Sequence, residues 1–153
     1  MYWITNQLAF GGLTSIAISD GATAILNLFE EQPYEPPANV VYRHNGFPDT
    51  QPFPMETIWD CVRWIDREIA AGRRVLVHCA EGNSRSVTVV IAYLIFKGGS
   101  LETAKSLILS KKRFYTARGV DTLEPMQFHD SFFTQWKEFL ARHAGGTLPS
   151  PGA

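Results

Sequence analysis

The sequence contains little cysteine and no excess of positive charge. Its 153 residues include two cysteines, too few for the disulfide framework of a small secreted protein. No pair of cysteines and histidines has zinc-finger or metalloprotease spacing, so we expect no structural metal. Lysine and arginine number 14 against 15 aspartates and glutamates, a net charge of −1, so nothing in the overall charge suggests a broad basic surface for nucleic acid or a membrane. Any anion site must therefore be local.

Long apolar runs are also absent. The longest, Val87–Phe96 interrupted by Thr88, is far shorter than the ~20 residues that a membrane-spanning helix needs. The N-terminal residues lack the basic start and apolar stretch of a signal peptide. The sequence therefore predicts a soluble protein of a reducing compartment, in the cytoplasm.

The composition that remains is typical of one folded domain. Hydrophobic residues make up 45% of the chain, and the 12 glycines and 9 prolines are too few for a disordered or collagen-like protein. A length of about 150 residues corresponds to a single core. We expect the folded domain to span residues 1–143 and the glycine- and proline-rich residues 144–153 to form a flexible tail. Nothing in the sequence fixes the oligomeric state, and a monomer is the expectation.

Hydrophobic periodicity predicts alternating strands and helices. Short aliphatic runs typical of buried strands occur at residues 24–28, 40–42 and 75–77, and residues 2–10 can supply another strand. Apolar spacing, glycine stops and capping residues predict helices at 55–71, 86–97, 101–112 and over an aromatic stripe at 128–140. We interpret the stripe as packing and the basic run Lys111–Arg113 as a solvated helix end. This order predicts an α/β fold with a mainly parallel sheet flanked by helices, and functional sites at the carboxyl ends of its strands.

The segment His78-Cys79-Ala80-Glu81-Gly82-Asn83-Ser84-Arg85-Ser86 lies between the predicted strand 75–77 and the long apolar helix. A tight loop in that position directs backbone N–H groups and the positive end of the helix dipole at one point, which makes an anion site. The same surroundings lower the pKa of a thiol, so Cys79 is a candidate thiolate nucleophile. Arg85 can grip two oxygens of a phosphoryl group, and Gly82 allows the tight backbone.

This segment resembles the signature of the cysteine-dependent protein phosphatases, and Ser84-Arg85-Ser86 is typical of their dual-specificity branch. The similarity runs from about Tyr2 to Arg113. It implies that Cys79 attacks phosphorus, that Arg85 and the loop residues 80–84 (Ala80, Glu81, Gly82, Asn83 and Ser84) bind the phosphoryl group, and that no metal or cofactor takes part.

The resemblance also implies supporting roles for three residues outside that group. Asp49, thirty residues before the cysteine in a proline-rich loop, is the expected general acid and base. Ser86 would assist the departing thiolate in the second step. His78 would orient the loop and tune the thiol without shuttling protons.

The expected function is hydrolysis of phosphotyrosine and phosphoserine or phosphothreonine on a phosphorylated protein. The carboxylate of Glu81 disfavours densely anionic substrates, so a phosphatase of a sugar, lipid or nucleotide ester is the alternative. A phosphate-binding module and a sulfurtransferase are further alternatives, which the intact Cys79 and the Arg85-Ser86 pair respectively disfavour. Cys61 is expected in the core, although a cysteine within reach of an oxidised Cys79 could form a disulfide with it.

Overall fold

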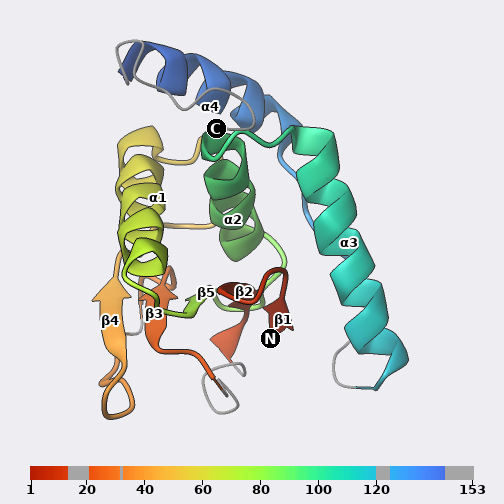
Figure 1. The fold of residues 1–153 in the computed structure, drawn as a ribbon. Helices are drawn as coiled ribbons and strands as arrows, with labels where there is room; N and C mark the ends of the chain where they lie inside the picture. The colour runs from red at the N-terminus through yellow and green to blue at the C-terminus, as the bar shows by residue number, and fades with distance from the viewer. Residues whose placement is uncertain (14–20, 32, 120–124, 144–153) are drawn as a thin grey trace.

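The computed structural model describes residues 1–13, 21–31, 33–119 and 125–143. Strands and helices alternate through the middle of the chain, and two helices complete it (Figure 1). The elements are β1 (Tyr2–Trp3), β2 (Leu8–Gly11), β3 (Ala24–Asn27), β4 (Val41–His44), α1 (Met55–Ala70), β5 (Val75–His78), α2 (Arg85–Phe96), α3 (Leu101–Ala117) and α4 (Asp130–His143).

The described strands form one sheet in the order β1-β2-β5-β3-β4. β5 lies at its centre and pairs in parallel with β2 and β3, and β3 pairs in parallel with β4. β1 alone is antiparallel, with Tyr2 opposite Phe10. The mainly parallel α/β fold expected from the sequence is therefore confirmed.

The expectation of one strand within residues 2–10 was wrong, because the chain reverses there and forms a hairpin. The backbone N–H of Ile4 donates to the carbonyl of Leu8 over 2.9 Å, and the N–H of Gln7 donates to the hydroxyl of Thr5 over 3.0 Å. A polar turn residue such as Thr5 offers the backbone a local partner, which competes with an extended strand.

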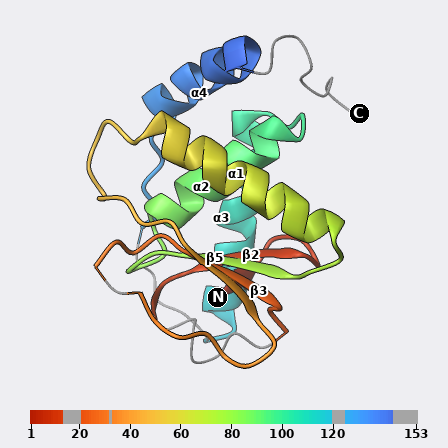
Figure 2. The same cartoon turned by 90° about the vertical axis from the view of Figure 1, so that its left-hand side faces the viewer.

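The helices and the sheet enclose the main hydrophobic core. Figure 2 shows α1 and α2 lying above the sheet, with α4 across their far side. Side chains alternate along β5, so that Val75 and Val77 face this core while Leu76 joins a second, smaller cluster with Ile25 and Ala9. Among the described residues, no helix is long and apolar enough to cross a membrane.

The helix boundaries follow the expected signals, with one extension. Pro54 precedes α1, and Gly72 follows its end with a φ of +86°. Ser100 caps α3, since its hydroxyl accepts the N–H of Thr103 over 3.1 Å. α3 continues to Ala117, five residues beyond the predicted end. The basic run is therefore inside a helix, and Lys112, predicted to be solvated, is buried.

The aromatic stripe of α4 packs against the core, as predicted. Trp136 is fully buried, stacks on Phe139, and donates its indole N–H to the carbonyl of Ala92 in α2 over 3.0 Å. The helix begins later than predicted, at Asp130, so Phe128 lies before it and is not part of the helical stripe. The predicted tail, residues 144–153, lies outside the described residues, and the domain boundary at 143 stays a prediction.

Candidate active site

A loop of residues 79–84 joins the central strand β5 to the first turn of α2, and close backbone packing holds it in place. The N–H of Leu13 donates to the carbonyl of Ala80 over 2.9 Å. A Cβ added at Gly12 would lie 2.7 Å from that same carbonyl oxygen. Gly82 has a φ of +82°, and a Cβ there would lie 2.7 Å from the backbone of Gly11. The loop can approach the end of β2 this closely because neither glycine carries a side chain.

Cys79 lies at the floor of this loop and is nearly inaccessible. Its Sγ accepts the backbone N–H of Gly82 over 3.3 Å and lies 3.4 Å from Oγ of Ser86. The amino end of α2 follows directly, so its dipole adds positive potential at the sulfur. The backbone N–H of Gly82 and the amino end of α2 thus both meet the sulfur, and this arrangement makes Cys79 a candidate nucleophile.

The side chain of Arg85 is buried, and its guanidinium is fixed from two sides. Its Nη1 donates to the carbonyl of Phe47 over 3.0 Å, and the ring of Phe29 lies 5.5 Å from the guanidinium carbon. Arg85 is only 7% exposed, yet its Nε has no hydrogen-bond acceptor among the residues that the structure describes. A buried N–H without an acceptor is costly, and an oxyanion is a ligand that can satisfy it.

Asp49 lies on an exposed stretch of the loop between β4 and α1. The hydroxyl of Ser84 donates to Oδ1 of Asp49 over 2.7 Å, which ties the carboxylate to the cysteine-containing loop. On either side of Asp49, the rings of Phe47 and Phe53 are buried with their centroids 5.7 Å apart. These two anchors hold the exposed carboxylate at the rim of the site.

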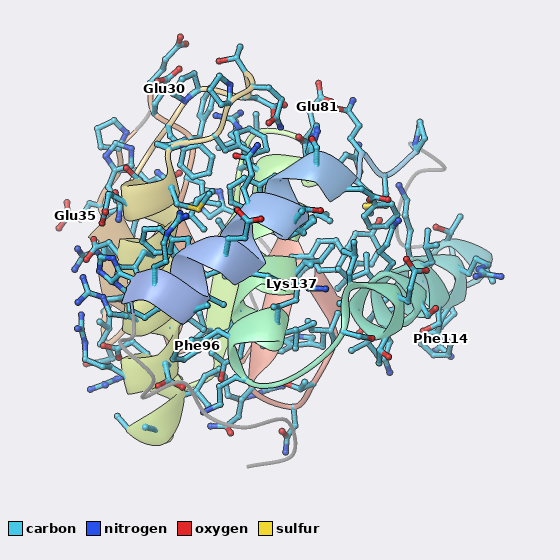
Figure 3. The ribbon with its side chains drawn as sticks, turned by 90° about the horizontal axis from the view of Figure 1, so that it is seen from above. Glu30, Glu35, Glu81, Phe96, Phe114 and Lys137 are labelled. Carbon is cyan, nitrogen blue, oxygen red and sulfur yellow. The ribbon has the colours of Figure 1, made fainter. Side chains whose placement is uncertain are left out.

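These side chains surround a cavity of about 140 Å³ that is partly open to solvent. Its lining residues are Asp49, Cys79, Ala80, Glu81, Asn83, Ser84, Arg85 and Gln127. Of the residues predicted to bind substrate, only Gly82 is outside this lining, and its N–H points to the sulfur instead. Glu81 is exposed and extends outward at the same edge of the molecule as Glu30 (Figure 3). The cavity combines a thiol, N–H donors and the two carboxylates of Asp49 and Glu81. A thiol beside N–H donors suits transfer of a small oxyanion.

His78 lies behind the cavity, fully buried at the end of β5. Its Nδ1 is 3.2 Å from the carbonyl of Cys79 and its Nε2 is 2.7 Å from the hydroxyl of Tyr34. A carbonyl can only accept, so Nδ1 carries the proton and Nε2 accepts from Tyr34. Burial lowers the pKa of His78 to about 4. His78 is therefore a neutral group that fixes the backbone of Cys79, a geometry consistent with the predicted orienting role.

Four residues around the site were missed or left out in the sequence interpretation. Gln127 lines the cavity, and its N–H donates to the carbonyl of Asn83 over 2.8 Å. Nε2 of His129 lies 2.9 Å from Oγ of Ser84, and Nζ of Lys112 donates to Oδ1 of Asn83 over 3.4 Å. The fourth is Tyr34, whose hydroxyl contacts His78 behind the cavity. All four are distant from residues 78–86 in sequence, so no local spacing identifies them.

Cys61 lies in α1 and is fully buried in the main core. Burial raises the pKa of its thiol to about 12, with the carboxylate of Asp60 adding to the effect. A thiol of this kind is poorly nucleophilic, which agrees with the expected packing role. Its disulfide with Cys79 stays a prediction.

Comparison with known proteins identifies the family. The model of the family described as dual specificity phosphatase, catalytic domain, matches residues 19–118, about two thirds of the chain. The chain belongs to this family. The family resemblance expected from the cysteine loop is thus confirmed.

Individual relatives agree with this family. The chain is 36% identical over 106 residues to dual specificity protein phosphatase 1 of Arabidopsis thaliana, an alignment that covers 64% of this chain and 54% of that protein. It is 40% identical over 57 residues to the phosphatidylglycerophosphate phosphatase PTPMT1 of the same plant, which covers 37% of this chain and 17% of that protein. The chain thus spans about half the length of the first relative.

A solved structure has the same fold. The crystal structure of human DUSP28 superposes with a TM-score of 0.69 at 22% identity, covering 95% of this chain and 99% of that one. Nearly the whole domain therefore shares the arrangement of strands and helices of that protein.

Proposed function

We propose that this protein is a phosphatase that hydrolyses phosphotyrosine and phosphoserine or phosphothreonine esters on proteins. The observation that carries the proposal is the meeting of Cys79 and Arg85 in one small cavity, with the carboxylate of Asp49 at its rim. The Nε–H of Arg85 has no acceptor within the part of the chain that the structure describes. Membership of the dual-specificity phosphatase family supports the same reaction.

In the first step, the thiolate of Cys79 attacks phosphorus and forms a sulfur–phosphorus bond. The bond from phosphorus to the ester oxygen breaks, and Asp49 gives its proton to that departing oxygen. The guanidinium of Arg85 and the N–H groups of the loop bind the remaining phosphoryl oxygens, where negative charge accumulates. The products are the free alcohol or phenol and a phosphocysteine.

In the second step, water attacks the phosphocysteine. Asp49, now a carboxylate, takes a proton from the water as it bonds to phosphorus, and the sulfur leaves as a thiolate. The hydroxyl of Ser86, 3.4 Å from Sγ, is placed to donate to that thiolate. Phosphate is released, and Asp49 is again protonated for the next cycle, so the second step returns the proton that the first step used.

The second candidate is a phosphatase of a non-protein ester, such as a sugar, lipid or nucleotide phosphate. The local identity to the phosphatidylglycerophosphate phosphatase PTPMT1 favours it. The exposed carboxylate of Glu81 at the cavity opposes the multiply phosphorylated members of this class, because a densely charged substrate would meet a like charge there. Esters with a single phosphoryl group, phosphorylated proteins among them, avoid most of this repulsion.

The test is a pH–rate profile of p-nitrophenyl phosphate hydrolysis without added metal. We expect a bell-shaped profile, no activity in Cys79→Ser, and slow turnover without the alkaline limb in Asp49→Asn. Cys61→Ser and Asp66→Asn are matched controls outside the site and should retain activity. A wild-type protein inactive at every pH would refute the proposal.

Substrate class is tested separately, with phosphotyrosine and phosphothreonine peptides against glucose 6-phosphate, phosphatidylglycerophosphate and AMP. A higher kcat/KM for the peptides supports the proposed class. Preference for one of the other esters would establish the second candidate instead.

A further inference from the structure

His129 lies outside the cysteine loop and outside the cavity lining, yet it contacts the loop directly. It precedes α4, and its Nε2 lies 2.9 Å from Oγ of Ser84. The same hydroxyl donates to Oδ1 of Asp49 over 2.7 Å. The hydroxyl oxygen of Ser84 thus connects the imidazole of His129 to the carboxyl group that we propose as the general acid.

The position of Ser84 shows that this contact is not simply helix capping. Ser84 is the N-cap residue of α2, where a serine hydroxyl usually accepts an N–H from the first turn. Here its side chain makes no such bond. The hydroxyl turns outward instead, between Asp49 and His129. Ser84 is only 5% exposed, so few other partners can reach it.

The imidazole is itself held in place by the loop that carries Asp49. The ring of Phe53 meets the ring of His129 edge to face, with centroids 5.0 Å apart. Phe53 is buried against Phe47 and Phe132. His129 therefore contacts both the acid-bearing loop and the cysteine loop, and a fixed ring can fix the direction of a hydrogen bond.

We propose that His129 is a positioning residue that selects which oxygen of Asp49 carries the catalytic proton. The proposal rests on the function proposed above. A serine hydroxyl has one hydrogen, so if Nε2–H of His129 donates to the oxygen of Ser84, that hydrogen is directed to Oδ1 of Asp49. Oδ1 is then an acceptor in both protonation states of Asp49, and the acid proton must reside on Oδ2.

This choice matters for the chemistry. Oδ2 is the oxygen not engaged by Ser84, so a proton there is available to the departing ester oxygen. In the opposite arrangement Ser84 donates to His129, and a proton on Oδ1 is held in a bond to Ser84. His129 as a donor therefore keeps Asp49 ready to act, and it does so without touching the substrate.

The substitution His129→Leu removes the donor, and His129→Gln retains an N–H at similar reach. We expect kcat for a phosphothreonine peptide to fall about 10-fold in His129→Leu and to recover in His129→Gln. The loss is smaller than the roughly 10²–10⁴-fold that a general acid contributes in full, because Asp49 itself remains. The loss should be smaller for p-nitrophenyl phosphate, whose leaving group needs little protonation. His143→Gln, at the exposed end of α4, is the matched control.

A double-mutant cycle separates positioning from general damage to the fold. In an Asp49→Asn background there is no acid proton to place, so His129→Leu should change kcat by less than about 2-fold. An equal, additive loss in both backgrounds overturns the inference. It leaves the proposed function intact, since wild-type activity and its loss in Cys79→Ser are measured in the same series.

A second measurement does not depend on activity. Long-range nitrogen–proton correlation spectra of the histidine rings report which nitrogen carries the proton, and the His129→Gln variant assigns the signals. We expect a proton on Nε2 of His129 at neutral pH. A neutral ring with its proton on Nδ1 and an accepting Nε2 would contradict the inference even in a protein that hydrolyses no ester.

Discussion

Adding a single methyl group at Gly12 should impair catalysis more than folding. The Cβ of an alanine there would lie 2.7 Å from the carbonyl oxygen of Ala80 and 2.8 Å from the carbonyl carbon of Glu81. Both are backbone atoms of the cysteine loop, so the loop itself must move. Overpacking of this kind costs about 1–3 kcal/mol, which for this chain length lowers Tm by roughly 2–12 °C. A displacement of about 1 Å in catalytic groups costs about 10²-fold in rate.

Gly72→Ala is the matched control. Gly72 has a φ of +86°, so an alanine there is strained, but nothing lies within 4 Å of the added Cβ. We expect it to lose about 1–2 kcal/mol of stability with an unchanged rate. Thermal melts and kcat/KM for an aryl phosphate, measured on both variants, separate the two effects. Wild-type kcat/KM in Gly12→Ala would refute the claim that this glycine positions the loop.

Two further predictions concern the buried groups around the cysteine. Arg85→Lys loses the planar guanidinium and its hydrogen bond to the carbonyl of Phe47. We expect kcat/KM to fall about 10²–10³-fold while the circular dichroism spectrum stays unchanged. A loss below 10-fold would contradict the role of Arg85. Burial lowers the pKa of His78 from 6.5 to about 4 in the folded protein. As the pH falls, His78 is therefore protonated in the unfolded chain before it is protonated in the folded one. The stability from neutral His78 is therefore complete above pH 6.5 and lost toward pH 4, by up to about 3 kcal/mol. Urea unfolding at pH 7 and pH 4.5 should show this difference in the wild type and a smaller one in His78→Asn; equal differences would exclude His78 as the cause.

The sequence predicted those parts of the site that are continuous in the chain. The strand, loop and helix around Cys79 follow from local signals, since a buried aliphatic run, a glycine and an N-terminal helix end occur within about twenty residues. Asp49 was found only through the spacing that the family implies. Its contact with Ser84, across 35 residues, depends on how the acid-bearing loop lies on α2.

What could not be predicted depends on tertiary contacts. Lys112 belongs to a basic run, a pattern that is typical of a solvated helix end. Its burial could not be predicted, because the pattern shows neither the five extra residues of α3 nor the contact with Asn83. His129 lies 45 residues beyond Ser84, on a stretch without regular structure. Its role as a neighbour of Ser84 follows from the packing of α4 over the core, which brings the preceding segment to the cavity.

The central claim is that Cys79 forms a covalent bond to phosphorus. Wild-type protein mixed with a phosphotyrosine peptide, quenched within milliseconds and digested, should yield a peptide with a phosphoryl group on Cys79 in mass spectra. Cys61 should remain unmodified. Turnover of the peptide without any modified Cys79 at the shortest times would contradict the account. Undiminished turnover in Cys79→Ser would contradict it as well.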